Sequence, residues 1–141
     1  MQIIFQDENK NDGSLAGEIA DGCKGLIYLS ETDAPMLSLA GKQADTVTAE
    51  TILQQTGRGA DTPVEEVDLA TFFARLTAIN DWYDDARKAS AKRFLDLQKL
   101  LEENLRELKV FKVGRIQLDI FVVGLDKDGC LVGVTTKAVE T

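Results

Sequence analysis

The strand-like run that decides the fold is Cys130-Leu-Val-Gly-Val-Thr-Thr-Lys-Ala-Val-Glu-Thr141, which stops on a bare threonine. Just before it, Leu125-Asp-Lys-Asp-Gly129 contains the Asp-Gly pair typical of a hairpin turn. Upstream of the turn, residues 116–124 alternate, with apolar side chains on one face and Gln117 and Asp119 pointing outward. We therefore predict that the two runs pair as antiparallel strands, and that the second presents a fixed carboxylate and hydroxyl at its end.

Four helices are expected before this hairpin. Ser14, Thr48 and Asp68 each precede a helical apolar pattern and can accept a hydrogen bond from its first turn. Gly57 can end the second of these helices, because glycine readily takes the left-handed closing conformation. The longest helix is predicted from Ala86 to about Lys109, a span without glycine or proline. Its apolar stripe consists of Phe94, Leu97, Leu101, Leu105 and Leu108.

Short strands and polar loops connect these helices. Residues 26–29 and 36–40 have strand character, and the polar loop between them places Glu31 on a surface turn. A further turn is expected at residues 41–43. The segment Gly57-Arg58-Gly59 lacks the lysine and hydroxyl residues of a phosphate loop, so it is interpreted as a flexible connector.

The order of these elements predicts an α+β domain. Helices, a few strands, more helices and a closing β meander favour a two- to three-layer sandwich, in which helices pack on a mainly antiparallel sheet. Residues 14–141 are expected to form this single domain, and residues 1–13 a loosely ordered N-terminal segment. Asp126 and Asp128 lack the glycine spacing and closing glutamate of a calcium loop, so no metal is predicted there.

The charge of the chain excludes several functions. The 141 residues include 24 acidic and 16 basic side chains, for a net charge of −8, and no histidine. Because phosphate binding needs basic residues, nucleic acid is not expected as a ligand, whereas a basic protein is a suitable partner. Solubility alone also explains an acidic composition. Without histidine there are no Ser-His or Cys-His nucleophile pairs and no His-based zinc motifs, so we predict neither an enzyme nor a cofactor.

The expected compartment is the cytoplasm. The sequence has no run of about eighteen apolar residues, so no membrane is predicted as a partner. The start, Met-Gln-Ile-Ile-Phe-Gln-Asp-Glu-Asn-Lys, lacks the basic and then apolar order of a signal peptide. Cys23 and Cys130 are accordingly predicted to be two reduced thiols.

The single tryptophan lies in the acidic segment Asn80-Asp-Trp-Tyr-Asp-Asp85. Tryptophan is highly buried on average, which favours a core position for Trp82. Its acidic neighbours instead favour an exposed side chain that contacts a partner, as interface tryptophans do. Residue statistics and local composition thus point in opposite directions.

Several segments of the chain carry a family resemblance. They are Leu29-Ser-Glu31, Ile52-Leu-Gln-Gln-Thr-Gly57, Val67-Asp68 with Phe72-Phe73, Asp81-Trp82-Tyr83, Leu118-Asp119 and Thr136-Lys-Ala-Val-Glu-Thr141. Through these segments, the chain from Gly25 onward resembles the nuclease A inhibitor family. Its members are small cytoplasmic bacterial proteins that block a sugar-nonspecific DNA/RNA endonuclease.

The resemblance implies a stoichiometric inhibitor, monomeric when free, that fills the active-site cleft of a magnesium-dependent ββα-metal nuclease in a 1:1 complex. It implies that Glu31, Trp82 and Thr141 lie at the interface, with Thr141 reaching the catalytic magnesium of the enzyme. Asp81 and Glu140, which adjoin these residues, complete the predicted partner-binding set. The protein itself is expected to hold no metal.

Two other functions remain open. An acidic protein-interaction module with a non-nuclease target predicts that loss of Thr141 has little effect on binding. A carrier or accessory enzyme would use Cys23 or Cys130 as its nucleophile, which needs an exposed thiol of low pKa. Cys130 lies at the start of an expected strand, and Cys23 lies at the end of an expected helix among small residues, which favours packing over reactivity for both.

Overall fold

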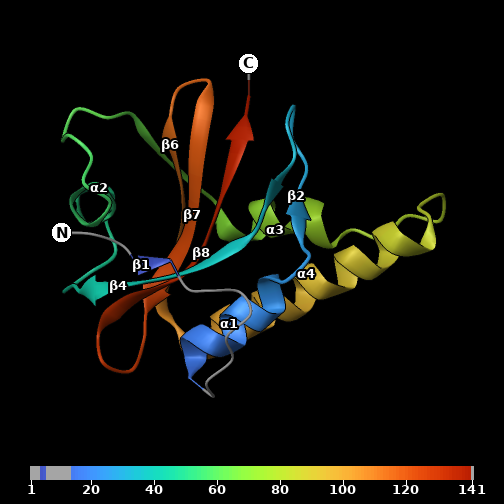
Figure 1. Ribbon diagram of the computed structural model, residues 1–141, viewed down its shortest axis with the longest axis horizontal. Helices are drawn as coiled ribbons and strands as arrows, with labels where there is room; N and C mark the ends of the chain where they lie inside the picture. The colour runs from blue at the N-terminus through green and yellow to red at the C-terminus, as the bar shows by residue number, and fades with distance from the viewer. Residues whose placement is uncertain (1–3, 6–13, 141) are drawn as a thin grey trace.

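Figure 1 shows the protein as a computed structural model, which describes residues 4–5 and 14–140. A six-stranded sheet with the strand order β1-β4-β8-β7-β6-β5 forms its centre, and a separate two-stranded sheet, β2 with β3, lies beside it. All of the strand pairs are antiparallel. In chain order the elements are β1 Ile4–Phe5, α1 Leu15–Cys23, β2 Ile27–Tyr28, β3 Ala34–Pro35, β4 Leu37–Gln43, α2 Ala49–Gln55, β5 Val64–Val67, α3 Leu69–Thr77, α4 Asp85–Asn104, β6 Arg106–Gly114, β7 Gln117–Leu125 and β8 Cys130–Val139.

The predicted hairpin of β7 and β8 is confirmed at the centre of the sheet. The two strands pair continuously, from Gln117 opposite Val139 to Leu125 opposite Leu131. In the turn between them, Gly129 has a φ of 79°, the left-handed conformation that the Asp-Gly pair indicates. The C-terminal run therefore has a neighbour on both sides, β7 on one and β4 on the other.

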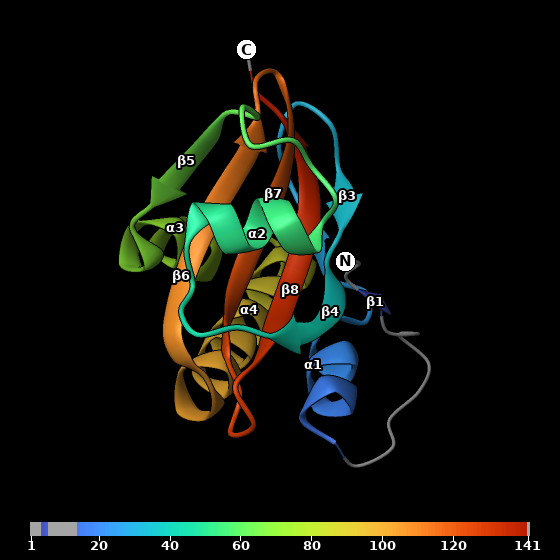
Figure 2. The same ribbon diagram turned by 90° about the vertical axis from the view of Figure 1, so that its left-hand side faces the viewer.

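Helices cover both faces of the sheet and make three layers (Figure 2). α1, α3 and α4 lie on one face, and α2 lies on the other. A helical layer packs on each face of the sheet because both faces of β7 carry apolar side chains. Leu118 and Ile120 join the core beneath α1, α3 and α4, whereas Phe121 and Val123 join the core beneath α2. The α+β sandwich predicted from the sequence is confirmed.

The predicted helix starts are confirmed by their caps. Side-chain oxygens of Ser14, Thr48 and Asp68 each accept a hydrogen bond from the backbone N–H three residues further on. Gly57, which follows α2, has the expected left-handed φ of 71°. Each cap pairs a backbone donor that the helix itself leaves unsatisfied, and this is why these residue types mark helix starts.

The longest helix is shorter than predicted. α4 begins after its cap Asp84 and ends at Asn104, so Leu105 and Leu108 do not belong to the helical stripe. Leu105 is extended, with φ −122° and ψ 139°, and the chain then enters β6 and pairs with β7. Neither glycine nor proline marks this boundary, and pairing with a neighbouring strand outweighs the local helical pattern.

A bulge in β6 brings a carboxylate to the loop before α2. The register of β6 against β7 shifts between Arg106 and Lys109, and Glu107 between them has a φ of 52°. Its carboxylate accepts hydrogen bonds from the Thr46 hydroxyl at 2.6 Å and from the backbone N–H of Val47 at 3.3 Å. These hydrogen bonds, the one from Thr46 above all, hold the pKa of Glu107 below its ordinary value.

The turn predicted at residues 41–43 is part of β4 instead. β4 continues to Gln43, with a shift of register against β8 after Ala40. The buried side chain of Gln55 in α2 accepts a hydrogen bond from the backbone N–H of Lys42 at 2.9 Å and donates one to its carbonyl at 3.1 Å. The side-chain amide of Gln55 thus takes the place of a neighbouring strand at Lys42. The local sequence pattern gives no sign of this contact, because Gln55 and Lys42 belong to different elements.

Candidate partner-binding surface

A bend at residues 30–33 connects β2 to β3 and is attached to the end of β8. The Ser30 hydroxyl oxygen accepts a hydrogen bond from the backbone N–H of Val139 at 3.2 Å and donates one to the carbonyl of Thr32 at 2.6 Å. The backbone N–H of Glu31 donates to the carbonyl of Val139 at 3.4 Å. Glu31 is exposed on this bend, as predicted, and its backbone adjoins the last residue of β8.

Glu140 lies at the same end of the sheet and is half-buried. Its backbone N–H donates to the carbonyl of Ile116, between β6 and β7, at 3.0 Å. Its carboxylate oxygens accept hydrogen bonds from the Lys112 ammonium at 2.9 and 3.0 Å. These contacts fix the backbone of Glu140 immediately before Thr141, which lies outside the described residues.

The loop between α3 and α4 exposes the tryptophan. Trp82 is 79% exposed, so the interpretation as a partner contact fits its position and the interpretation as a core residue is wrong. The Tyr83 ring stands edge-on to it, with the ring centres 5.8 Å apart, and the Arg87 guanidinium lies 4.1 Å from the Tyr83 ring centre. Asp81 is exposed in the same turn. The loop therefore presents a large apolar side chain supported by an aromatic ring.

A cleft of about 370 Å³ lies between β2 and the α3–α4 loop. Leu29 and Tyr83 both line it. Leu29 is two residues before Glu31, and Tyr83 directly follows Trp82, so the cleft connects the two parts of the predicted surface. The predicted residues fall into two groups, Glu31 with Glu140 and Asp81 with Trp82.

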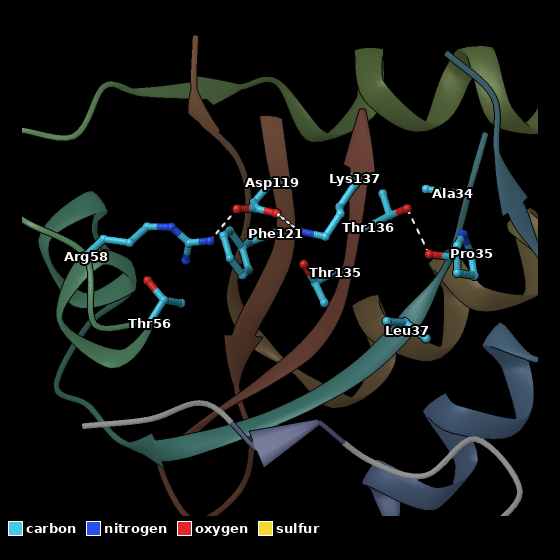
Figure 3. Close-up of a pocket in the computed structure, with 10 residues that line it drawn as sticks. All are labelled: Ala34, Pro35, Leu37, Thr56, Arg58, Asp119, Phe121, Thr135, Thr136 and Lys137. Carbon is cyan, nitrogen blue, oxygen red and sulfur yellow. Dashed lines mark hydrogen bonds and ion pairs between the residues drawn. The ribbon is translucent and has the colours of Figure 1, made fainter. Parts of the chain in front are cut away.

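A second cavity, of about 620 Å³, contains charged residues that the sequence analysis missed (Figure 3). Asp119, predicted to point outward from the strand, is half-buried and forms ion pairs with Arg58 and with Lys137, the latter at 2.9 Å. The Arg58 guanidinium also lies 5.4 Å from the ring centre of Phe121. The segment interpreted as a connector is thus anchored through Arg58. The sequence did contain a signal that Asp119 is covered. Phe121 and Val123 lie on the same face of the strand as Asp119, and apolar residues on a strand face indicate that other elements pack on it.

Neither thiol suits the enzyme alternative. Cys23 is buried, with 2% of its surface exposed. Burial raises the pKa of the Cys130 thiol, and the nearby carboxylates of Asp126 and Asp128 raise it further. A raised pKa leaves less of the nucleophilic thiolate at neutral pH. Within residues 4–5 and 14–140, no group of three or more Cys, Asp or Glu side chains is placed to hold a metal ion.

The described part of the chain also contains no helix long and apolar enough to cross a membrane. The fold and the loops together define a class of protein: a three-layer α+β sandwich that displays carboxylates and an aromatic side chain from its loops, the chemistry of a protein-contact surface. The sequence model of a family described as nuclease A inhibitor-like protein matches residues 14–141. The chain belongs to this nuclease A inhibitor-like family, as the sequence resemblance indicates. A comparison with curated proteins gives no match.

Proposed function

We propose that this protein is a stoichiometric inhibitor of a magnesium-dependent, sugar-nonspecific DNA/RNA endonuclease of the ββα-metal type. It fills the active-site cleft of the enzyme in a 1:1 complex and catalyses nothing itself. Membership of the nuclease A inhibitor-like family supports the inhibitor class. The two free thiols suit a reducing compartment, so we infer that it acts in the cytoplasm. From the family resemblance we further infer a bacterial protein that is monomeric when free.

The observation that carries the proposal is the attachment of the 30–33 bend to the end of β8. Ser30 and Glu31 both hydrogen-bond to the backbone of Val139, so the Glu31 bend is attached directly to the strand that leads to Thr141. A protein that fills a rigid cleft benefits from such preorganisation, because less conformational entropy is lost on binding.

Charge brings the two proteins together. A nuclease cleft is lined with basic side chains that hold phosphates, and the same field attracts a protein with a net charge of −8. Glu31 then pairs with an arginine at the position of a phosphate, in a bidentate and charge-assisted contact. Asp81 adds negative charge beside Trp82, whereas Glu140, whose carboxylate is paired with Lys112, contributes at the end of β8 next to Thr141.

Trp82 and Thr141 supply the other two contacts. The exposed indole of Trp82 gives an apolar anchor that loses water on binding. Thr141 supplies hard oxygen ligands of the kind that magnesium accepts in place of water. Since the inhibitor offers no phosphodiester to cleave, it stays bound at the metal instead of being turned over.

A titration tests the proposal. Plasmid degradation by a magnesium-dependent ββα-metal nuclease is followed as the protein is added, at low and high salt. We expect activity to fall to zero near one equivalent, with weaker inhibition at high salt. An unrelated protein of similar negative charge serves as the control and should not inhibit stoichiometrically. Full activity in a large excess of this protein would refute inhibition of that enzyme and favour a non-nuclease target.

A further inference from the structure

Exposed apolar side chains gather around the cleft between β2 and the α3–α4 loop. Six large hydrophobic side chains are exposed within the described residues, and four of them either line this cleft or belong to the α3–α4 loop beside it. These four are Ile27 at 42%, Leu29 at 48%, Ile79 at 50% and Trp82 at 79% exposed. A cluster of this kind on an acidic, highly charged chain indicates a contact surface rather than chance exposure.

The two apolar faces of the β2 segment explain part of this cluster. Leu26 and Tyr28 point inward and are each 1% exposed, as core residues should be. Ile27 and Leu29 point the other way and line the cleft. A strand with one face in solvent normally carries polar residues on that face. The outward face of this strand is thus built for burial, yet nothing in the described chain covers it fully.

The walls of the cleft are held in place. Tyr83 is stacked against the Arg87 guanidinium at 4.1 Å. On the other side, the Arg75 guanidinium donates a hydrogen bond to the Tyr28 hydroxyl at 2.6 Å. An apolar cavity of about 150 Å³ already accommodates a benzene ring. At about 370 Å³, this cleft has room for a large apolar side chain of another protein without rearrangement.

We infer that this cleft receives an apolar side chain, such as leucine, isoleucine, methionine or phenylalanine, from the proposed partner nuclease. The inference rests on the proposed function and adds a docking site to it. Position is the first argument for this occupant: the cleft lies between Glu31 and Trp82, so a partner that contacts both passes over it.

Charge is the second argument. The charged residues that line the cleft are Arg75, Arg87 and Asp84, so the lining itself has one more positive than negative charge on a negative protein. A basic segment of the nuclease does not match this lining. The inserted side chain therefore comes from a neutral or acidic segment at the border of the nuclease active site. The inhibitor then holds its target both inside the catalytic cleft and beside it.

Two matched pairs of substitutions test the inference in the titration described above. Leu29→Ser removes an apolar wall, and Leu95→Ser removes a similarly exposed leucine of α4 that does not line the cleft. Ala86→Phe fills the cleft, and Ala89→Phe adds the same bulk at an exposed position of α4 outside it. Circular dichroism establishes whether each variant is folded. If Ala86→Phe does not fold, the comparison of Leu29→Ser with Leu95→Ser alone decides whether the cleft is a docking site.

We expect Leu29→Ser and Ala86→Phe each to raise the inhibition constant roughly tenfold or more, and both controls to stay within about twofold of the unmodified protein. The loss for Leu29→Ser should be the same at low and high salt, because an apolar contact is not screened. If the unmodified protein inhibits and neither cleft variant is weaker, or if Ala86→Phe binds more tightly, the docking site is wrong and the inhibitor function stands. If the unmodified protein does not inhibit, both proposals fall for the nuclease tested.

Discussion

The backbone N–H of Glu31 donates a hydrogen bond to the carbonyl oxygen of Val139 at 3.4 Å, between the β2–β3 bend and the central sheet. With the Ser30–Val139 hydrogen bond of 3.2 Å, it sets the position of the bend relative to the end of β8. A proposed charge contact and the approach to a proposed metal contact thereby share one rigid support. Single substitutions can probe this support directly.

Replacing Ser30 with alanine should loosen the bend. The variant loses the hydrogen bonds that the Ser30 hydroxyl forms with Val139 and Thr32. We expect the free energy of unfolding, measured with urea, to fall by about 1 kcal/mol, and inhibition to weaken at the same time. Thr32→Ala is the control, because Ser30 contacts only the backbone of Thr32. Unchanged inhibition by Ser30→Ala would show that the attachment does not matter for binding.

Replacing Glu31 with alanine should slow association with the nuclease. A carboxylate that steers the encounter contributes mainly to the association rate, and its contribution is screened by salt. We expect a slower association rate constant at low salt and a smaller change of that constant with salt, both measurable by surface plasmon resonance. Glu102→Ala, on the exposed end of α4, gives the control for loss of one negative charge. An equal effect of both variants would assign the steering to net charge alone.

Deleting Thr141 should weaken inhibition by about 1–3 kcal/mol, if its oxygens bind the catalytic magnesium of the partner. Calorimetric titration of the nuclease with magnesium present measures this loss. In a chelator, the full-length and shortened proteins should bind with similar affinity, because the shared metal is gone. A loss that persists without metal would point to a role other than metal binding.

Stability should depend on pH through Glu107. The hydrogen bonds from Thr46 and Val47 lower its pKa in the folded protein below the ordinary 4.5. The carboxylate therefore stabilises the fold above that pH, and the contribution is lost as the pH falls through the lowered pKa. Urea midpoints of the unmodified protein and of Glu107→Gln should differ above the ordinary pKa of 4.5 and converge as the pH falls through the lowered pKa. Glu103→Gln, which makes the same charge change on α4, is the control variant.

Both thiols should react slowly with iodoacetamide at neutral pH. Cys23 is buried, and the raised pKa of Cys130 keeps it largely protonated. Labelling of Cys130 should speed up as the pH rises, because the thiolate is the reacting species. Mass spectrometry follows each site. Rapid labelling of either thiol at pH 7 would instead support the enzyme alternative. In a separate measurement, Cys130→Ser should inhibit the nuclease as well as the unmodified protein does.

Features that depend on local chemistry were predictable from the sequence. The caps at Ser14, Thr48 and Asp68 need only a side-chain oxygen and the next three residues. The hairpin of β7 and β8 likewise follows from the turn chemistry near Gly129 and from alternation on either side of it. Glu31 was correctly placed on an exposed turn, because the polar loop around it carries no apolar pattern.

Features that depend on distant neighbours were not predictable. The end of α4 at Asn104 is decided by pairing of β6 with β7, and β4 extends past Ala40 because Gln55 of α2 reaches its backbone. The ion pair of Asp119 with Arg58 joins residues that are far apart in the chain. The acidic neighbours of Trp82 indicated that its side chain is exposed, whereas the average burial of tryptophan indicated a core position, so the sequence alone could not decide between them.

The bond between Ser30 and Val139 joins residues 109 positions apart, and this has a consequence for synthesis. A ribosome must release nearly the whole chain before β8 can meet the bend. Under the proposed function, a nascent or truncated product without β8 lacks the assembled surface and does not inhibit the nuclease. Inhibition by a newly made molecule therefore begins only after β8 has been translated and has paired with the sheet.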